Sequence, residues 1–401
     1  MLTEAAPPSL LADGPAPSTE PNLPTSPNAI TLITGGDVTL GFHFEEWVDA
    51  GLADGGTKES SWAYPFAEVR TVTDAADVFL VNLECPFTDR GEKIPKNFNF
   101  RARPELAAAL VRGGVDAVSL ANNHTMDFGE VGMLDTMATL DAARIPHFGA
   151  GRTLAEARRP LILERHGKRI ALLGYLFLGT HNIEPHVIFA TDSFPGVAGH
   201  ATDEAAMRAM LLTDIAAAKS VADFVIPFFH WGREGRAIPE GYQVRLARAA
   251  VDAGASAVLG SHPHVLQGME EFGGRPIVYS LGNFVFGGNW NPLEKRAALL
   301  KLTLDSSRAP VAEVVPVRVD RYPDRPFQPY LLTGAEAQDV LKLLAKYSSV
   351  LSAQLPQLRA HYAPQPIYSA PPTMPRPSPG RERSSFPADS FKTDGGTDGG
   401  R

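Results

Sequence analysis

Cysteine is almost absent from this sequence, since Cys85 is the only one among 401 residues. A lone thiol excludes an internal disulfide and any metal site built from several thiolates. Cys85 is either a nucleophile or a small core residue, and the core role is the commoner one for a free cysteine. Cysteine usage therefore gives no indication of the redox compartment.

Long apolar runs are also missing. No stretch approaches the roughly 18 consecutive apolar residues that a membrane-spanning helix needs. The first 28 residues lack a basic start, and Leu10-Leu11-Ala12 is too short for the apolar core of a signal peptide. We expect no membrane span and, unless a signal precedes Met1, a cytoplasmic protein.

A surplus of positive charge is the third absence. The formal net charge is -8, with 20% charged and 44% hydrophobic residues, which is ordinary for a soluble globular protein. An acidic chain has no general attraction to nucleic acid or to an anionic membrane. We therefore expect no nucleic-acid partner.

Composition divides the chain into three parts. Residues 1–28 are rich in Pro, Ala, Ser and acidic residues, and residues 363–401 repeat this bias and end in Gly-Gly-Thr-Asp-Gly-Gly-Arg. Both segments predict disorder, as an N-terminal arm and a C-terminal tail. Residues 29–362 have the patterning of one folded domain.

Apolar β-branched segments alternate with helical ones along that domain. Predicted strands cover residues 30–34, 78–81, 117–120, 169–175, 224–229, 257–259, 277–280 and 312–320. Predicted helices cover residues 106–111, 132–143, 203–222, 243–253 and 334–355. This alternation indicates an α/β fold with substantial parallel sheet, on which the late strand and the last helix pack.

Polar side chains follow the predicted strands at their C-terminal ends. These residues are Asp37, Glu84, Asn123, His230, His262 and His264. Ligands of α/β sheets bind beyond the carboxyl ends of the strands, so five segments could converge on one place. Oxygen and imidazole donors suit Mn, Fe, Zn or Mg, and a pair of such ions can activate water and clamp an attacked phosphorus or acyl centre.

Each of these signals has an ordinary alternative when it is taken alone. Gly36-Asp37 is common in turns, Asn122-Asn123-His124 is common in loops, and His230 could be a hydrogen-bonded core histidine. Their order and shared place at strand ends favour a site. His43 remains a candidate ligand or substrate contact, whereas the other histidines are interpreted as surface or structural: His147, His166, His181, His186, His200 and His361.

Six motifs in order resemble one bacterial family. They are Gly36-Asp37-Val38-Thr39-Leu40-Gly41, Val81-Asn82-Leu83-Glu84, Ser119 to Gly129 around Asn122-Asn123-His124, His230-Trp231-Gly232-Arg233-Glu234, Gly260-Ser261-His262-Pro263-His264-Val265 and Tyr279-Ser280-Leu281-Gly282-Asn283-Phe284. Over residues 31–287 the chain is similar to the CapA, or poly-gamma-glutamate capsule-biosynthesis (PGA_cap), family of the metallophosphoesterase (calcineurin-like) superfamily.

The resemblance implies a four-layer α/β/β/α sandwich with a metal site at strand ends. Its motifs make Asp37, Glu84, Asn123, His230, His262 and His264 the metal ligands, with Glu84 as the bridge, and His124 the catalytic acid or phosphate-stabilising group. Asn122, Arg101 and Arg233 are candidate contacts for an anionic substrate, as is Arg103, although a solvated surface charge is equally ordinary for an arginine.

The motifs also depart from the superfamily pattern. Asp37-Val38-Thr39 stands where the superfamily has Asp-x-His, and Asn82-Leu83-Glu84 replaces Gly-Asp-x-x-Asp. One or two divalent metal ions are therefore expected. Family members are often exported or membrane-anchored, which differs from the expectation drawn from the N-terminus.

Two functional hypotheses follow. The first is a metal-dependent hydrolase or transferase that acts on a phosphate ester or a γ-glutamyl or peptide-like bond in capsule biosynthesis, with an anionic polymer or phosphorylated compound as substrate. The alternative is a non-catalytic accessory subunit of a polymer synthase or exporter that keeps a structural metal. The missing first-motif histidine favours the second hypothesis, and His124 favours the first.

Overall fold

The computed structural model describes residues 28–51, 61–180 and 188–360. The predicted tail and all but the last residue of the predicted arm lie outside these ranges, as do His181, His186 and His361. All of these described residues belong to one unit of the chain, residues 1–362.

Eight strands form the first sheet. Seven run in the order β16-β15-β14-β1-β2-β3-β4, and β13 also pairs with β1. The bounds are β1 Ile30–Thr39, β2 Val78–Leu83, β3 Ala117–Ser119, β4 His147–Phe148, β13 Asn283–Phe286, β14 Arg296–Leu304, β15 Val311–Arg318 and β16 Tyr330–Leu331. β1 pairs in parallel with β2 and β13, and β2, β3 and β4 continue the parallel half, whereas β14, β15 and β16 pair antiparallel.

Six strands form the second sheet, in the order β11-β12-β10-β9-β7-β6. The bounds are β6 Leu161–Arg165, β7 Lys168–Phe177, β9 Phe224–Trp231, β10 Val258–Ser261, β11 Met269–Phe272 and β12 Arg275–Val278. Its four inner strands are parallel, and the two edge strands are antiparallel to their neighbours. A small third sheet pairs β5 (Ala150–Gly151) with β8 (Gly196–Val197).

The helices flank these sheets. They are α1 His43–Asp49, η1 Tyr64–Val69, α3 Arg70–Thr73, η2 Pro104–Leu106, α4 Ala107–Arg112, α5 Gly129–Ala142, α6 Leu154–Ala157, α7 Glu204–Lys219, α8 Gly241–Asp252 and α9 Gly334–Ala360. The first residues of two helices carry capping side chains that can be recognised in the sequence. Asp203 accepts a hydrogen bond from the backbone N–H of Ala206 at the start of α7, and Glu240 and Gln243 form a reciprocal capping box at the start of α8.

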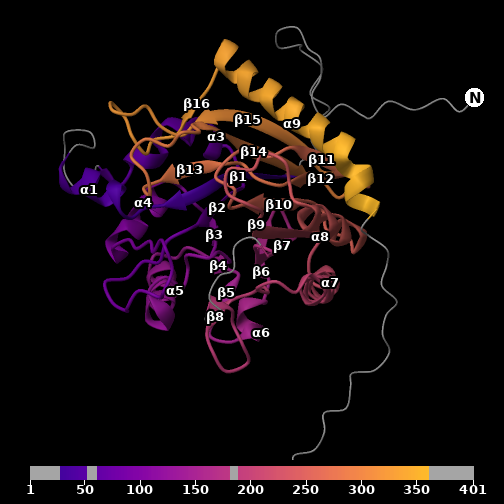
Figure 1. Cartoon of the computed structure of the whole chain (residues 1–401), viewed down its shortest axis with the longest axis horizontal. Helices are drawn as coiled ribbons and strands as arrows, with labels where there is room; N and C mark the ends of the chain where they lie inside the picture. The colour runs from indigo at the N-terminus through magenta and orange to yellow at the C-terminus, as the bar shows by residue number, and fades with distance from the viewer. Residues whose placement is uncertain (1–27, 52–60, 181–187, 361–401) are drawn as a thin grey trace, which may run out of the picture. The chain divides into compact units, whose positions relative to one another are not determined.

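Three hydrophobic clusters separate four layers. Alternate residues of β1 and β2, such as Leu32 and Leu80, meet Leu172 and Ile226 of the second sheet in the central cluster. The outer face of the first sheet, turned away from the central cluster, packs on α4 and α5. The outer face of the second sheet packs on α7 and α8. Because side chains alternate across a strand, each sheet buries both faces. The predicted α/β/β/α sandwich is confirmed, with α5 and α7 on opposite sides of the sheets in Figure 1.

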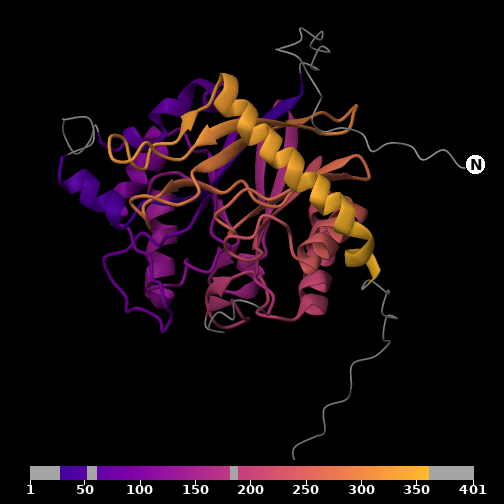
Figure 2. The same ribbon diagram turned by 45° about the horizontal axis from the view of Figure 1, so that its top comes forward.

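The last helix covers one edge of this sandwich. α9 contacts α8, β11 and β15, and it crosses above both sheets in Figure 2. Val340 and Leu344 belong to the central cluster, whereas Leu351 joins the cluster beneath α8. The prediction that this helix packs on the main domain is confirmed. Among the described residues, no helix combines the length and the apolar character needed to cross a bilayer.

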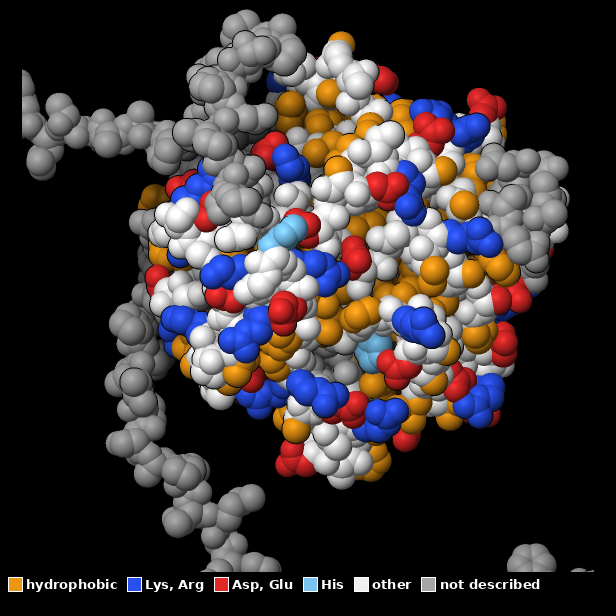
Figure 3. Space-filling model, turned by 180° about the vertical axis from the view of Figure 1, so that it is seen from behind, with side chains coloured by type: hydrophobic (Ala, Val, Ile, Leu, Met, Phe, Trp, Pro, Cys, Tyr) orange, Lys and Arg blue, Asp and Glu red, His pale blue; other side chains and the backbone are white. Residues whose placement is uncertain are grey.

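Basic and acidic side chains are interspersed over the face seen in Figure 3, and among its described residues neither sign gathers into one broad patch.

Some predicted strand limits are wrong. β1 continues through Gly35-Gly36 to Thr39, so Asp37 lies within the strand, as His230 does in β9. Gly36-Asp37 taken alone could have marked a turn, but here Gly36 allows a close approach between neighbouring backbone segments. A Cβ atom on Gly36 would lie 1.8 Å from the carbonyl oxygen of Gly282, which precedes β13. β14, which continues the sheet beyond β1, was not predicted.

Candidate metal centre

The candidate site lies where the two sheets meet at the C-terminal ends of their parallel strands. β1, β2 and β3 of the first sheet supply Asp37, Glu84 and the loop that carries Asn123, while β9 and β10 of the second supply the histidines. Hydrogen bonds join the halves. The backbone N–H of His262 donates to Asp37 Oδ2 at 3.2 Å, and His230 Nε2 lies 2.9 Å from Asn123 Oδ1. This is the crevice that the strand-end pattern predicts.

Glu84 occupies the middle of the site. Both of its carboxylate oxygens are buried and have no hydrogen-bond partner among the residues that the structure describes. Glu84 Oε1 lies 3.5 Å from His230 Nε2, 3.8 Å from His264 Nε2 and 4.0 Å from His124 Nε2. Burial, and then the neighbouring Asp37, raise the pKa of Glu84 well above its ordinary value. A buried carboxylate without hydrogen bonds is costly, and a bound cation would offset that cost.

Two groups of donors share this carboxylate. Glu84, His230 and His262 form one group, and Asp37, Glu84 and His264 form the other. Within each group the candidate ligand atoms lie within 4.8 Å of one another. Asn123 Oδ1 is a further oxygen donor beside the first group, because it lies 2.9 Å from His230 Nε2. The donors fit one or two divalent ions, and Glu84 is the only residue common to these two groups.

The electrostatics of the histidines differ across the site. Burial, and then the neighbouring His262, lower the pKa of His230, and burial also lowers the pKa of His262, which leaves both rings neutral and able to bind a metal. Burial also opposes a charge on His264, but Glu84 and Asp37 outweigh it and raise its pKa to about 10. The carboxylate side of the site therefore attracts a cation.

The backbone at the histidine pair is unusual. His262 has φ 98° and His264 has φ 57°, in the left-handed region that side chains other than glycine rarely adopt. Such conformations persist where the surrounding structure enforces them, and they cluster at functional sites. The turn through Pro263 thereby directs two neighbouring imidazoles into one cluster, with ring centroids 5.8 Å apart.

His124 has partners of its own on the rim of the cluster. Its Nδ1 lies 2.6 Å from Asp127 Oδ2, and the Asp127 carboxylate also pairs with Lys96 Nζ at 2.9 Å. The ring stacks on Phe100 with centroids 4.1 Å apart. A carboxylate on Nδ1 fixes the ring orientation and leaves Nε2 directed at Glu84. His124 is therefore held with Nε2 facing the histidine–carboxylate cluster.

The structure brings together all seven residues predicted as metal ligands or catalytic group. The other predicted contacts lie in different settings. Asn122 fastens the loop, because its amide donates to Asn82 Oδ1 and to the Leu83 carbonyl. Arg101 lies 4.5 Å from the centroid of the Phe128 ring, and Arg233 is exposed. Their contact with substrate stays a prediction.

Several other polar residues and Cys85 have structural contacts outside the candidate metal centre. Arg103 pairs with Asp49, and His43 pairs with Glu46, so both have partners within α1. Cys85 is buried in the core cluster, and burial raises its pKa to about 12, which agrees with a core role rather than a nucleophile. His147 and His166 pair with acidic neighbours, as structural histidines do.

Five site residues were not predicted. Asn82 donates to Asp37 Oδ1 at 2.9 Å, Asn283 Oδ1 lies 2.9 Å from His264 Nδ1, and Glu234 belongs to a third donor group with His262 and His264. These three stand inside the recognised motifs, and that was the available signal. Asp127 also stands in a motif, three residues after His124. Lys96 lies in a stretch with no regular pattern, so only the fold reveals it.

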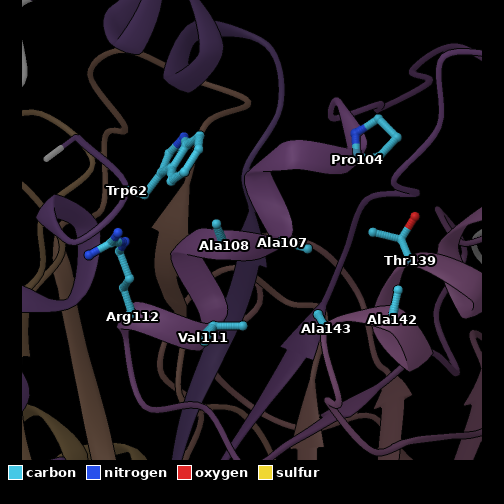
Figure 4. A pocket seen from close by; sticks show the side chains of 9 residues that line it. All are labelled: Trp62, Pro104, Ala107, Ala108, Val111, Arg112, Thr139, Ala142 and Ala143. Carbon is cyan, nitrogen blue, oxygen red and sulfur yellow. The ribbon is translucent and has the colours of Figure 1, made fainter. Parts of the chain in front are cut away.

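A separate hollow of about 770 Å³ lies over α4 and α5 (Figure 4). Its lining residues are Trp62, Pro104, Ala107, Ala108, Val111, Arg112, Thr139, Ala142 and Ala143. They are mostly apolar and include no candidate ligand or acid–base group of the histidine–carboxylate cluster. The hollow is therefore distinct from the candidate metal centre.

The layers and the cluster together define a protein of the metallophosphoesterase-like class. The family model described as bacterial capsule synthesis protein PGA_cap matches residues 31–288, and this chain belongs to that family.

Three similar proteins carry related descriptions. The capsule biosynthesis protein CapA of Bacillus anthracis is 32% identical, over 74% of this chain and 69% of its own length. The PGA biosynthesis protein CapA of Bacillus subtilis is 30% identical, over 71% and 70%. A Mycobacterium tuberculosis protein described as a probable polyglutamine synthesis accessory protein is 29% identical, over 74% and 86%. The predicted CapA-like family is confirmed.

Proposed function

We propose that this protein is a metal-dependent hydrolase or transferase that acts on a phosphate ester or a γ-glutamyl or peptide-like bond during capsule or poly-gamma-glutamate synthesis. The observation that carries the proposal is the buried Glu84 carboxylate, which lies among three histidines and has no hydrogen bond within the described part of the chain. Such a group is stabilised by a cation more than by any protein contact present.

The described residues divide into two ligand sets in this proposal. Asp37, Glu84 and His264 would hold one ion, and Glu84, Asn123, His230 and His262 would hold the other. Mn, Fe, Zn or Mg would supply an activated water and polarise the bond that is attacked. Imidazole-rich donors favour Zn or Fe at the second position, and carboxylates favour Mn or Mg at the first.

His124 is the proton donor to the leaving group in this mechanism. Asp127 accepts the hydrogen bond from Nδ1 and stabilises the protonated ring, so that the proton on Nε2 faces the metal cluster. Lys96 pairs with Asp127 and also donates to the Asn123 carbonyl at 2.7 Å, which links the acid to a metal-binding loop. Phe100 covers one face of the ring and limits the access of water to it.

The names of the relatives support the polymer as the setting. Two are described as capsule or PGA biosynthesis proteins, and poly-gamma-glutamate is an anionic polymer. Guanidinium groups suit carboxylate and phosphate, so Arg101 and Arg233 are the proposed contacts for an anionic substrate. A polymer synthase or export complex is the proposed partner.

A second candidate function is that of a non-catalytic accessory subunit with a structural metal. Thr39 stands where the superfamily has a histidine, and its hydroxyl donates to the Glu84 carbonyl at 3.2 Å. The relative from Mycobacterium tuberculosis carries the word accessory in its description. Retention of the oriented His124–Asp127 pair favours the enzyme, because a structural metal does not require it.

The test combines metal analysis with an activity screen. After reconstitution with Mn, Fe or Zn, we expect near-stoichiometric metal in the wild type and loss of metal when His230→Ala and His264→Ala are combined. Phosphodiester, phosphomonoester and γ-glutamyl substrates should reveal an activity that falls by about 10²–10⁴-fold in His124→Ala. His166→Ala, at a hairpin turn, is the matched control and should behave as wild type.

The outcomes separate the two candidate functions. A wild type that stays metal-free contradicts both, because each requires a bound ion. A metal-loaded wild type whose activity is unchanged in His124→Ala removes the catalytic role and favours the accessory subunit.

A further inference from the structure

Glu234 lies at the solvent side of the metal cluster. Its carboxylate forms a donor group with His262 and His264, in which the candidate ligand atoms lie within 4.8 Å of one another. The residue is exposed, whereas Asp37, Glu84 and His262 are fully buried. Its charge also contributes to the raised pKa values of Glu84 and His264, after burial and the nearer charged groups. Glu234 is thus close enough to His264 for both side chains to bind one ion.

The loop that carries Glu234 is fastened to the histidine turn. The backbone N–H of Gly235 donates to the Pro263 carbonyl at 2.9 Å, between the two histidines of that turn. On the other side, the N–H of Gly232 donates to the Tyr242 hydroxyl at 2.8 Å. Gly232 and Gly235 have φ 94° and 70°, which glycine adopts without strain. The loop therefore holds Glu234 beside the site through backbone contacts on both flanks.

The carboxylate side of the cluster has room for a further ligand. Asp37, Glu84 and His264 make three donors, and these metals usually take four or more ligands, the remainder coming from other side chains, water or substrate. Thr39 cannot replace the first-motif histidine, because its hydroxyl is directed to the Glu84 carbonyl. Among the described residues, Glu234 is the additional acidic side chain that groups with His264, in a set completed by His262.

We propose that Glu234 is a ligand of the metal ion on the His264 side, supplying from the β9 loop the donor that the first motif lacks. This inference rests on the metal centre of the proposed function and adds a ligand to it. A third carboxylate makes this position more anionic and favours a hard cation such as Mn²⁺. Because Glu234 is exposed, it is also the ligand that water or an anionic substrate displaces.

Metal titration tests this assignment independently of activity. Metal-free wild type, Glu234→Gln, Glu234→Asp and Glu271→Gln are titrated with Mn²⁺ and with Co²⁺, and affinity, stoichiometry and the visible absorption of Co²⁺ are measured. We expect Glu234→Gln to weaken one ion by about 10- to 100-fold and to change the Co²⁺ spectrum, with partial recovery in Glu234→Asp. Glu271, exposed on β11, is the matched control for lost surface charge.

Each outcome has one reading. Wild type without bound Mn²⁺ or Co²⁺ contradicts the metal centre and the proposed function together. Wild-type binding that is equalled by Glu234→Gln within about twofold overturns only the role of Glu234. Equal weakening in Glu234→Gln and Glu271→Gln also overturns it, because general surface charge would then explain the effect. Circular dichroism of each variant checks that folding is retained.

Discussion

At the scale of single residues, the site is built from side chains that do not stabilise the fold. Glu84 is the clearest example, because its carboxylate is fully buried beside Asp37 and receives no hydrogen bond from any described residue. A group arranged in this way destabilises the metal-free protein and becomes favourable when a cation is bound. The left-handed backbone conformation of His262 is likewise unfavourable for the fold taken alone.

Glu84→Gln should therefore stabilise the metal-free protein while it abolishes metal binding. The folded-state pKa of Glu84 is raised above 4.5, so its unfavourable contribution grows as pH rises above that value. We expect a gain of about 1–3 kcal/mol at pH 8 and a smaller gain at pH 5, measured by chemical denaturation in chelator. Glu271→Gln is the control, and a loss of stability in Glu84→Gln at pH 8 would contradict this account.

At the scale of elements, buried charge is tolerated where it is fully paired. The short strand β11 directs Glu270 inward, where it binds Arg248 of α8 through two oxygens and accepts a hydrogen bond from the Tyr279 hydroxyl at 2.7 Å. Glu271, the next residue, is exposed. This network ties α8 to the edge of the second sheet.

Glu270→Ala should be strongly destabilising, because it leaves the largely buried Arg248 guanidinium without its partner. We expect a loss of about 3–5 kcal/mol in the free energy of unfolding, measured by urea denaturation. Glu271→Ala changes the same residue type on the opposite face of the strand and should stay within about 0.5 kcal/mol of wild type. Similar losses in both variants would show that strand propensity matters more than the ion pair.

At the scale of the whole molecule, the residues of the candidate metal centre come from both sheets. Asp37, Glu84 and Asn123 come from the first sheet, and His230, His262 and His264 come from the second. An ion bound by both groups stabilises only the folded state, in which these ligands meet.

Removal of metal should therefore lower the melting temperature. At a free metal concentration about 1,000 times the dissociation constant, binding adds about 4 kcal/mol, which corresponds to a shift on the order of 10 °C. Differential scanning calorimetry with and without chelator measures this shift. His264→Ala should respond less to chelator than wild type, and a wild type insensitive to chelator would argue against a metal that bridges the sheets.

The sequence by itself predicted the family and, through that resemblance, the four layers and the seven residues that the structure brings together. Strand-end motifs such as Ser261-His262-Pro263-His264 are local, and the carboxyl ends of parallel strands meet at one edge of a sheet, so order along the chain was sufficient to bring them together. The periodicity of the helices was likewise a local property, which is why α7 and α8 were found close to their predicted limits.

Only the tertiary structure decided how the remaining residues act. Lys96 reaches Asp127 across a loop without regular pattern, Asn122 donates to the Leu83 carbonyl of β2, and Glu234 approaches His264 because the Gly235 N–H donates to the Pro263 carbonyl. These roles depend on distances between segments that are far apart in sequence. Residue types alone do not encode such distances, because each distance depends on how two separate segments pack together in the folded protein.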